Sequence, residues 1–233
     1  QYCSPCGKRY QTMVVASDFD DKNTDPFALE VFLKTCKRIQ PSIICLAGDV
    51  FEAYEFSRFD KDPRCWDAAG RLAWVRDNLF APLRRACPNA QIDLLAGNHE
   101  HHLLRHMAER TPEMKAVLAD FMGLSFADLL GLPKFKINLV CQHDLSAYTL
   151  KDVRAEVSKN RKTYFGCVTV DHYPDNFTFG TNSVGAHTHK PSFSVSRNEV
   201  LGNVWAMTLG CMCKCENEYT NHNHNQNGFG IIH

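Results

Sequence analysis

Hydrophobic residues in the first half of the chain form short runs that alternate with amphipathic segments. Short apolar runs that stop at polar residues predict strands, and apolar residues at three- and four-residue spacing predict helices. The predicted strands are 13–16, 43–47 and 91–96, and the predicted helices are 26–40, 62–87 and 103–130, the last with breaks at Pro112 and Gly123. This β-α-β-α-β-α order is typical of an α/β sheet.

The second half of the chain changes to apolar runs separated by Gly, Pro and Asn turns, which is typical of strands. The predicted strands are 136–142, 164–170, 183–186, 192–196 and 204–209. Residues 221–228 are rich in Asn and His, and this composition predicts a loop. The pattern by itself therefore supports a mixed α/β class and nothing narrower.

Composition narrows the class of protein. The chain has 233 residues, and its 26 Lys and Arg balance 26 Asp and Glu, which excludes a generally basic protein that coats nucleic acid. The sequence contains no apolar run as long as a membrane span and no apolar stretch at its start, so we expect neither a membrane protein nor a signal peptide. Most of the eleven cysteines lie in apolar runs, which indicates buried thiols in a reducing, cytoplasmic compartment.

Oxygen-bearing side chains directly follow three of the predicted strands. These residues are Asp18, Asp49 and Asn98. Ligand sites in α/β sheets gather at the carboxyl ends of strands, so we expect the three side chains to share one crevice. Any one of them alone is better explained as a turn former or a helix cap, because Asp and Asn after a strand usually have that role.

Histidines follow several of the predicted strands and add a second kind of potential metal ligand near the strand ends. His99 follows Asn98, His143 follows the strand 136–142, and His187 and His189 follow the strand 183–186. Carboxylate and amide oxygens together with imidazoles suit divalent metals such as Mn, Zn, Fe or Ni. A carboxylate shared by two such metals is the arrangement used to hydrolyse phosphoesters.

These residues lie in five short segments, which are Ser17-Asp18, Gly48-Asp49-Val50-Phe51, Gly97-Asn98-His99-Glu100, His143 and His187-Thr188-His189. In composition and order, the five segments resemble the motifs of the calcineurin-like metallophosphoesterases. The resemblance covers residues 12–210. Within this family, the sequence most resembles the small exonuclease-like phosphoesterases of bacteria and phages, and residues 48–63 support that narrower match.

The resemblance implies a four-layer α-β-β-α sandwich and a dinuclear phosphoester hydrolase. The first metal would be held by Asp18, Asp49 and His189, and the second by Asp49, Asn98, His143 and His187. Asp49 would bridge the two metals, and His99 would act beside the phosphate as a catalytic group. The expected ions are Mn, or else Zn, Fe, Ni or Mg.

Asp20 departs from the family pattern, because the first motif of the family reads Asp-x-His and here reads Asp18-Phe19-Asp20. Three interpretations stay open. Asp20 is a hard oxygen ligand that favours Mn or Mg, or it weakens the first metal and slows the enzyme, or it inactivates the chain.

These features favour a phosphodiesterase or nuclease that acts on DNA or RNA. The alternatives are a phosphatase or cyclic-nucleotide phosphodiesterase for a small substrate, and a weakened form that binds nucleic acid without cutting it. Candidate substrate contacts are Arg58, Arg154, Arg161 and Lys162. The last three belong to a basic stretch that attracts phosphates, although interleaved acidic residues are also typical of a solvated helix face.

Cysteines near both ends suggest a separate structural zinc. Cys3 and Cys6 have the C-x-x-C spacing of a zinc knuckle in a segment of residues 1–11. Cys211, Cys213 and Cys215, in the segment 211–233, would complete the site if the two ends meet. The alternative is that these cysteines are free thiols. The sequence names no partner for His172 and leaves the oligomeric state open.

Overall fold

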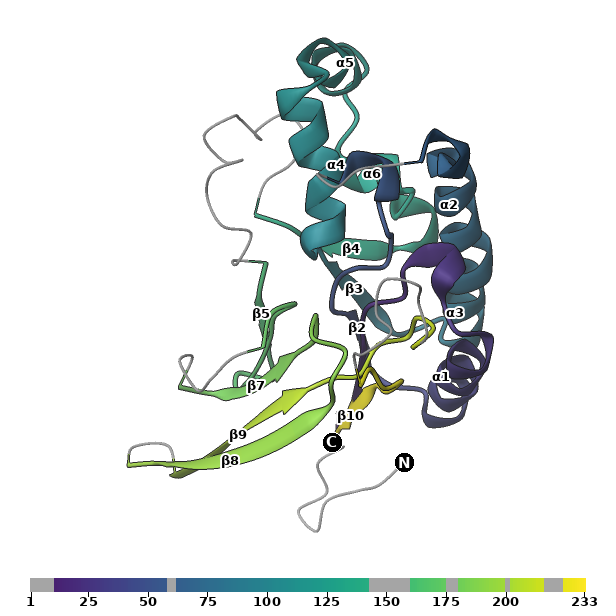
Figure 1. Ribbon diagram of the computed structural model, residues 1–233. Helices are drawn as coiled ribbons and strands as arrows, with labels where there is room; N and C mark the ends of the chain where they lie inside the picture. Colours follow the sequence, from purple (N-terminus) through teal and green to yellow (C-terminus); the bar gives the residue numbers. More distant parts are fainter. Residues whose placement is uncertain (1–10, 58–61, 143–159, 175–179, 200–201, 216–223) are drawn as a thin grey trace.

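The computed structural model describes residues 11–57, 62–142, 160–174, 180–199, 202–215 and 224–233. Two five-stranded sheets lie against each other, and the helices gather on the outer side of the first sheet (Figure 1). Each sheet contains both parallel and antiparallel pairs. The α/β class is therefore confirmed, with two mixed sheets.

The first sheet has the strand order β10-β1-β2-β3-β4. Its strands are β1 (Met13–Ala16), β2 (Ile43–Leu46), β3 (Gln91–Leu95), β4 (Ile137–Val140) and β10 (Gly230–Ile232). The strands β1 to β4 run parallel, whereas β10 pairs antiparallel with β1. Parallel strands end at the same edge, so the residues that follow β1, β2 and β3 come together there.

Between β1 and β4, the described residues form six α-helices. They are α1 (Pro26–Ile39), α2 (Ala68–Val75), α3 (Ala81–Ala86), α4 (Asn98–Glu109), α5 (Pro112–Ala116) and α6 (Phe126–Leu130). As predicted, α1 has Pro26 in its first turn, and the Asp25 carboxylate accepts a hydrogen bond from the backbone N–H of Ala28. The predicted helix 62–87 starts later than expected, and a π-helical stretch, Arg76–Phe80, joins α2 to α3.

The second sheet has the strand order β5-β6-β7-β9-β8. Its strands are β5 (Lys162–Tyr164), β6 (Val168–Val170), β7 (Asn182–Gly185), β8 (Ser192–Asn198) and β9 (Gly202–Thr208). The prediction of one strand over 164–170 is wrong. Phe165 and Gly166 adopt positive φ in a tight turn, which divides the segment into two antiparallel strands.

Alternate residues of β1 belong to two different cores, because successive side chains of a strand point to opposite faces. Val14 and Ala16 pack with Phe32 of α1 in the cluster beneath the helices. Met13 and Val15 pack with Val184 of β7 in the cluster between the sheets. The described residues thus form a helix-sheet-sheet order. They contain no helix after β4, so the fourth layer stays a prediction.

A buried carboxylate ties the two sheets together. Asp93 of β3 accepts hydrogen bonds from Lys162 Nζ at 2.7 Å and from the Tyr164 hydroxyl at 2.8 Å, both on β5. Asn138 of β4 donates a third at 2.9 Å. Burial alone would raise the pKa of Asp93, but these bonds hold it below its ordinary value. No helix in the described ranges is long and apolar enough to cross a membrane.

Candidate metal centre

The ends of five strands meet where the two sheets come together. Asp18, Asp49 and Asn98 follow β1, β2 and β3 of the first sheet, as the sequence predicted. His172 and His187 follow β6 and β7 of the second sheet. The second sheet therefore supplies imidazoles opposite the carboxylates and the amide of the first.

The backbone of this centre is held in an unusual conformation. Ten non-glycine residues in the described part of the chain have positive φ, and five of them are predicted metal ligands. These five are Asp18, Asp20, Asp49, His187 and His189, with φ between 50° and 65°. The left-handed region costs L-residues free energy, so it persists only where the surroundings enforce it. Strain of this kind is concentrated at functional sites.

Asp49, His172 and His187 form one compact group. One ligand atom from each lies within 4.8 Å of the others. His172 Nε2 is 3.2 Å from Asp49 Oδ2 and 3.0 Å from Asn98 Oδ1. Ligands around one metal ion with bonds near 2.1 Å are separated by about 3.0–3.4 Å. The separations of His172 from Asp49 and Asn98 therefore match those of metal ligands, and with His187 nearby the group has a donor set that suits a divalent metal.

Asp49 and His172 attract each other electrostatically, and this attraction shifts the pKa values of both side chains. Burial disfavours the charged form of both side chains, but their mutual attraction outweighs it. The pKa of Asp49 falls well below its ordinary value, with His99 also contributing, and the pKa of His172 rises to about 9. The other nitrogen of His172, Nδ1, lies 2.8 Å from the carbonyl oxygen of Ala47, which fixes the orientation of the ring.

Two further carboxylates each turn one oxygen toward a histidine ring, and the other oxygen of Asp18, Oδ2, accepts a hydrogen bond from the backbone N–H of His187 at 3.2 Å. Asp18 Oδ1 lies 3.3 Å from His189 Nε2, and Asp20 Oδ1 lies 3.3 Å from His99 Nδ1. Both of these oxygens are buried and have no hydrogen-bond partner among the described residues. Burial opposes protonation of His99, yet Asp49 and Asp20 hold its pKa well above the ordinary value. In the same way, Asp18 raises the pKa of His189 to about 10.

Glu100 holds the loop that carries Asp49. Its buried carboxylate accepts backbone hydrogen bonds from Asp49, Val50, Phe51 and Gly97 at 2.8–3.2 Å. The loops after β2 and β3 are therefore fixed to each other by one side chain. The backbone N–H of His99 in turn donates to Asp49 Oδ1 at 2.9 Å.

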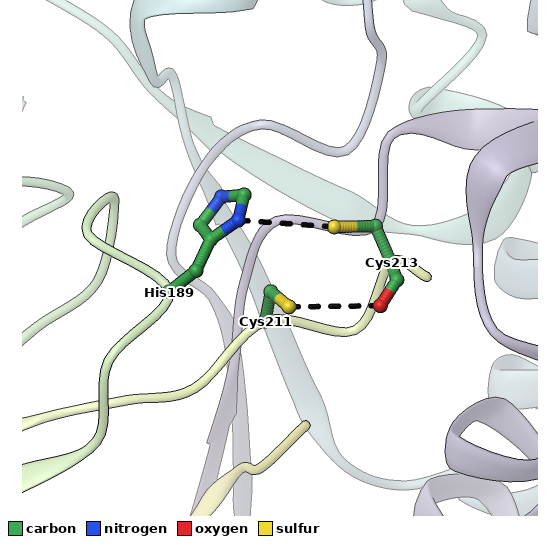
Figure 2. A group of neighbouring side chains, drawn as sticks. All are labelled: His189, Cys211 and Cys213. Carbon is green, nitrogen blue, oxygen red and sulfur yellow. Dashed lines mark hydrogen bonds between the residues drawn. The ribbon is translucent and has the colours of Figure 1, made fainter. Parts of the chain in front are cut away.

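A second compact group lies beside this centre and contains sulfur. His189, Cys211 and Cys213 have ligand atoms that all lie within 4.8 Å of one another (Figure 2). A contact with the Cys213 thiol and the neighbouring His189 ring lower the pKa of Cys211 to about 5, against the opposing effect of burial. Cys211 and Cys213 are buried, and Cys215 is half-buried.

Some predicted residues cannot be placed. His143, Arg58, Arg154, Cys3 and Cys6 lie outside the described residues. Of the predicted substrate contacts, Lys162 is bonded to Asp93, and Arg161 Nε lies 3.6 Å from Asp171 Oδ2. Their contact with a substrate stays a prediction.

His172 is the site residue that the sequence reasoning missed. It is buried and contacts Asp49, Asn98 and Ala47, although the sequence suggested no partner for it. The signal was present, because the apolar strand β6 ends at Val170 and Asp171-His172 follow directly. It was overlooked because the other histidines came from the motifs of the resemblance, and His172 belongs to none of them.

Comparisons with known proteins give matches among solved structures only. No model of a known protein family matches the chain, and no curated protein does. The structure is similar to the Pseudomonas putida nuclease MPE, at a TM-score of 0.44 and 13% identity over 88% of this chain and 76% of that chain. It is also similar to a metallophosphoesterase from Sphaerobacter thermophilus, at 0.45 and 16% identity over 96% and 84%. A third similar structure is TT1561 of Thermus thermophilus, at 0.37 and 10% identity over 88% and 91%.

Proposed function

We propose that the chain is a metal-dependent phosphoester hydrolase. The observation that carries the proposal is the Asp49–His172–His187 group with Asn98 beside it, at the junction of the two sheets. A bridging carboxylate, an amide oxygen and two imidazoles suit a divalent cation that activates water. This assignment rests on residues of the chain itself. Asp49, Asn98 and His187 belong to the motifs in the sequence, whereas His172 does not.

The chemistry of the site fits metals independently of the motif order. Asp18 and Asp49 are fully or almost fully buried, and Asp20 is 7% exposed, so three carboxylates are gathered in a region with little water. Buried like charges are costly unless cations neutralise them. The unpartnered oxygens of Asp18 and Asp20 are further acceptors that a cation would satisfy.

We assign the second metal to Asp49, Asn98, His172 and His187, with His172 in the place that the motif order had assigned to His143. The first metal would be held by Asp18 and Asp49, with Asp20 as an oxygen ligand and His189 as the imidazole that the sequence predicted. When bound, these metals supply an activated water molecule and neutralise charge on the phosphoryl oxygens.

His99 is the residue that we assign to proton transfer. Its ring nitrogens face Asp20 and Asp49, at 3.3 and 3.8 Å, and its side chain is only partly buried. The two carboxylates favour the protonated ring, which can donate a proton to the oxygen that leaves phosphorus. Asp49 also fixes the position of His99 by accepting the hydrogen bond from its backbone N–H.

We propose a phosphodiester as the substrate class, with DNA or RNA as the polymer. Support comes from the sequence, in which a basic stretch that includes Arg161 and Lys162 lies between His143 and His187. The small-substrate phosphatase and the non-cutting nucleic-acid binder are the alternatives that the experiment below separates.

The test combines metal content with hydrolysis of bis-p-nitrophenyl phosphate in the presence of Mn, for the chain as it stands and for Asp20→His. We expect bound divalent metal and hydrolysis in the unmodified chain, because Asp20 is an oxygen donor near the site. Activity in Asp20→His alone would identify Asp20 as a disabling residue. Hydrolysis by neither form would support a protein that binds without cutting.

Asn98→Ala removes one proposed ligand and is expected to abolish hydrolysis while the fold persists. His224→Ala changes an exposed histidine and serves as the matched control. Full activity in Asn98→Ala would contradict the assignment of the second metal. Cleavage of single-stranded and double-stranded DNA and RNA, compared with p-nitrophenyl phosphate, then identifies the substrate class.

A further inference from the structure

The group next to the hydrolytic centre has a different donor chemistry from the centre itself. Figure 2 shows His189 from the loop after β7 and two cysteines from the segment after β9 turned toward one another. His189 Nδ1 lies 3.9 Å from Cys213 Sγ. Around a tetrahedral zinc ion, a nitrogen and a sulfur ligand are separated by about 3.6 Å, so this pair lies within a few tenths of an ångström of the spacing that zinc requires.

The backbone already holds the two cysteines in place. Asn227 donates from Nδ2 to the carbonyl oxygens of Cys211, at 3.2 Å, and Cys213, at 2.7 Å. Between them, the N–H of Met212 donates to the carbonyl oxygens of Ser17 and Asp18 at 3.1 and 3.0 Å. The turn that carries the two cysteines is therefore hydrogen-bonded directly to the loop that carries Asp18. Because the backbone of this turn is already fixed, a metal ion would have to order little of the chain on binding.

We propose that Cys211, Cys213 and Nδ1 of His189 bind a zinc ion beside the hydrolytic centre. Two sulfur ligands and one imidazole favour zinc over the Mn or Mg that oxygen-rich sites select. Three ligands leave one position for water or for Cys215, which neighbours Cys211. The site does not require Cys3 or Cys6, and the proposal is independent of whether the chain hydrolyses phosphoesters.

The zinc ion would decide the role of His189. With Nδ1 bound to metal, a neutral ring carries its proton on Nε2, which faces Asp18 Oδ1 at 3.3 Å. A carboxylate that accepts from the second nitrogen of a zinc-bound histidine is a common supporting arrangement. Because Nδ1 would be bound to zinc and Nε2 would carry the proton, His189 could not also ligate the first hydrolytic metal. The zinc ion would thus replace the role given to His189 above, and that metal would depend on Asp18, Asp20 and Asp49. Asp20 and the two cysteines would then both affect the first metal position, Asp20 as an oxygen ligand in it and the cysteines by holding His189 at the zinc ion.

The test measures zinc by mass spectrometry in the full chain, purified with a reductant and dialysed, and in Cys211→Ser and Cys213→Ser. We expect about one zinc ion per chain to be lost in each variant. Cys167→Ser is the control, because Cys167 is an exposed cysteine outside the group, and it should keep the zinc ion. Cobalt substitution of the unmodified chain should give thiolate-to-cobalt charge-transfer absorption, which oxygen and nitrogen ligands alone do not produce.

Asn98→Ala should keep the thiolate-to-cobalt absorption, because it affects only the hydrolytic group. Retention of zinc in both cysteine variants would overturn the proposal. Absence of the thiolate band from the unmodified chain would also overturn it, and this measurement holds even if a cysteine variant fails to fold. A chain with the zinc ion but without hydrolysis would support this site and contradict the proposed function.

Discussion

His172 Nε2 lies 3.2 Å from Asp49 Oδ2, and this contact joins the end of β6 in one sheet to the end of β2 in the other. The ring is almost completely buried, and its other nitrogen lies 2.8 Å from the carbonyl oxygen of Ala47. One imidazole thus spans the junction between the sheets at the point where the candidate metal ligands converge.

We predict that His172→Asn lowers the affinity for the second metal by roughly 10²-fold or more. Loss of a partner that only supports a ligand costs 10- to 100-fold, and loss of a ligand costs at least as much. Calorimetric titration with Mn measures the change. His106→Asn is the control, since His106 lies about two turns further along α4 than Asn98 and packs against Phe56. Equal affinity in the two variants would remove His172 from the site.

His99→Ala is expected to leave both metals bound and to slow turnover by roughly 10²-fold or more, as for a group that transfers a proton in the transition state. The measurement is kcat together with metal content at saturating metal. A fall in metal content would instead identify His99 as a ligand. A leaving group that needs no proton, such as p-nitrophenolate, should reduce the effect of the substitution.

Glu100→Gln is expected to lower the free energy of unfolding by about 2 kcal/mol or more. The carboxylate accepts four backbone hydrogen bonds, whereas the amide would turn an NH₂ group toward some of the same donors and leave them unsatisfied. Urea denaturation measures the loss. Glu109→Gln, at the exposed end of α4, should change stability by less than about 0.5 kcal/mol. Equal effects would mean that Glu100 does not hold the Asp49 loop.

Asp93→Asn should destabilise the protein by about 2 kcal/mol at neutral pH, because Lys162 and Tyr164 lose a charged acceptor. The pKa of Asp93 is lowered in the folded chain, so its contribution is complete above the ordinary carboxyl value of 3.8 and disappears as pH falls through the folded value. The difference from the unmodified chain should therefore shrink on acidification. Urea denaturation at falling pH checks this, with the surface substitution Asp120→Asn as control. A constant difference would contradict the charged pairing.

The strand ends of the first sheet were predictable because their signal is local. An apolar run followed at once by Asp18, Asp49 or Asn98 contains both the strand and the side chain at its end. His172 has a similar signal after Val170, where the predicted strand 164–170 also ends, but it belongs to none of the motifs on which the resemblance rests. The resemblance assigned His143 and His187 to the second metal, and His143 lies outside the described residues, so that assignment stays a prediction.

Other features depend on contacts between distant parts of the chain. β10 has three residues and pairs with β1, more than 200 positions away. The approach of Cys213 to His189 depends on how β7 and β9 are paired in the second sheet. A C-x-C spacing predicts that sulfur ligands are available, but it does not predict that the imidazole comes from the last histidine motif.

The left-handed backbone of the ligand residues has a consequence for how this protein would respond to selection. Glycine is the residue best suited to positive φ, so replacing His187 or His189 by glycine would relieve strain worth about 1–3 kcal/mol at each position. Each replacement would also delete an imidazole. Screening a mutant library for thermal stability alone should therefore recover glycine at these positions, in variants that are more stable but have lost metal ligands. In this chain, the residues that would bind metal are the same residues whose backbone conformation lowers the stability of the fold.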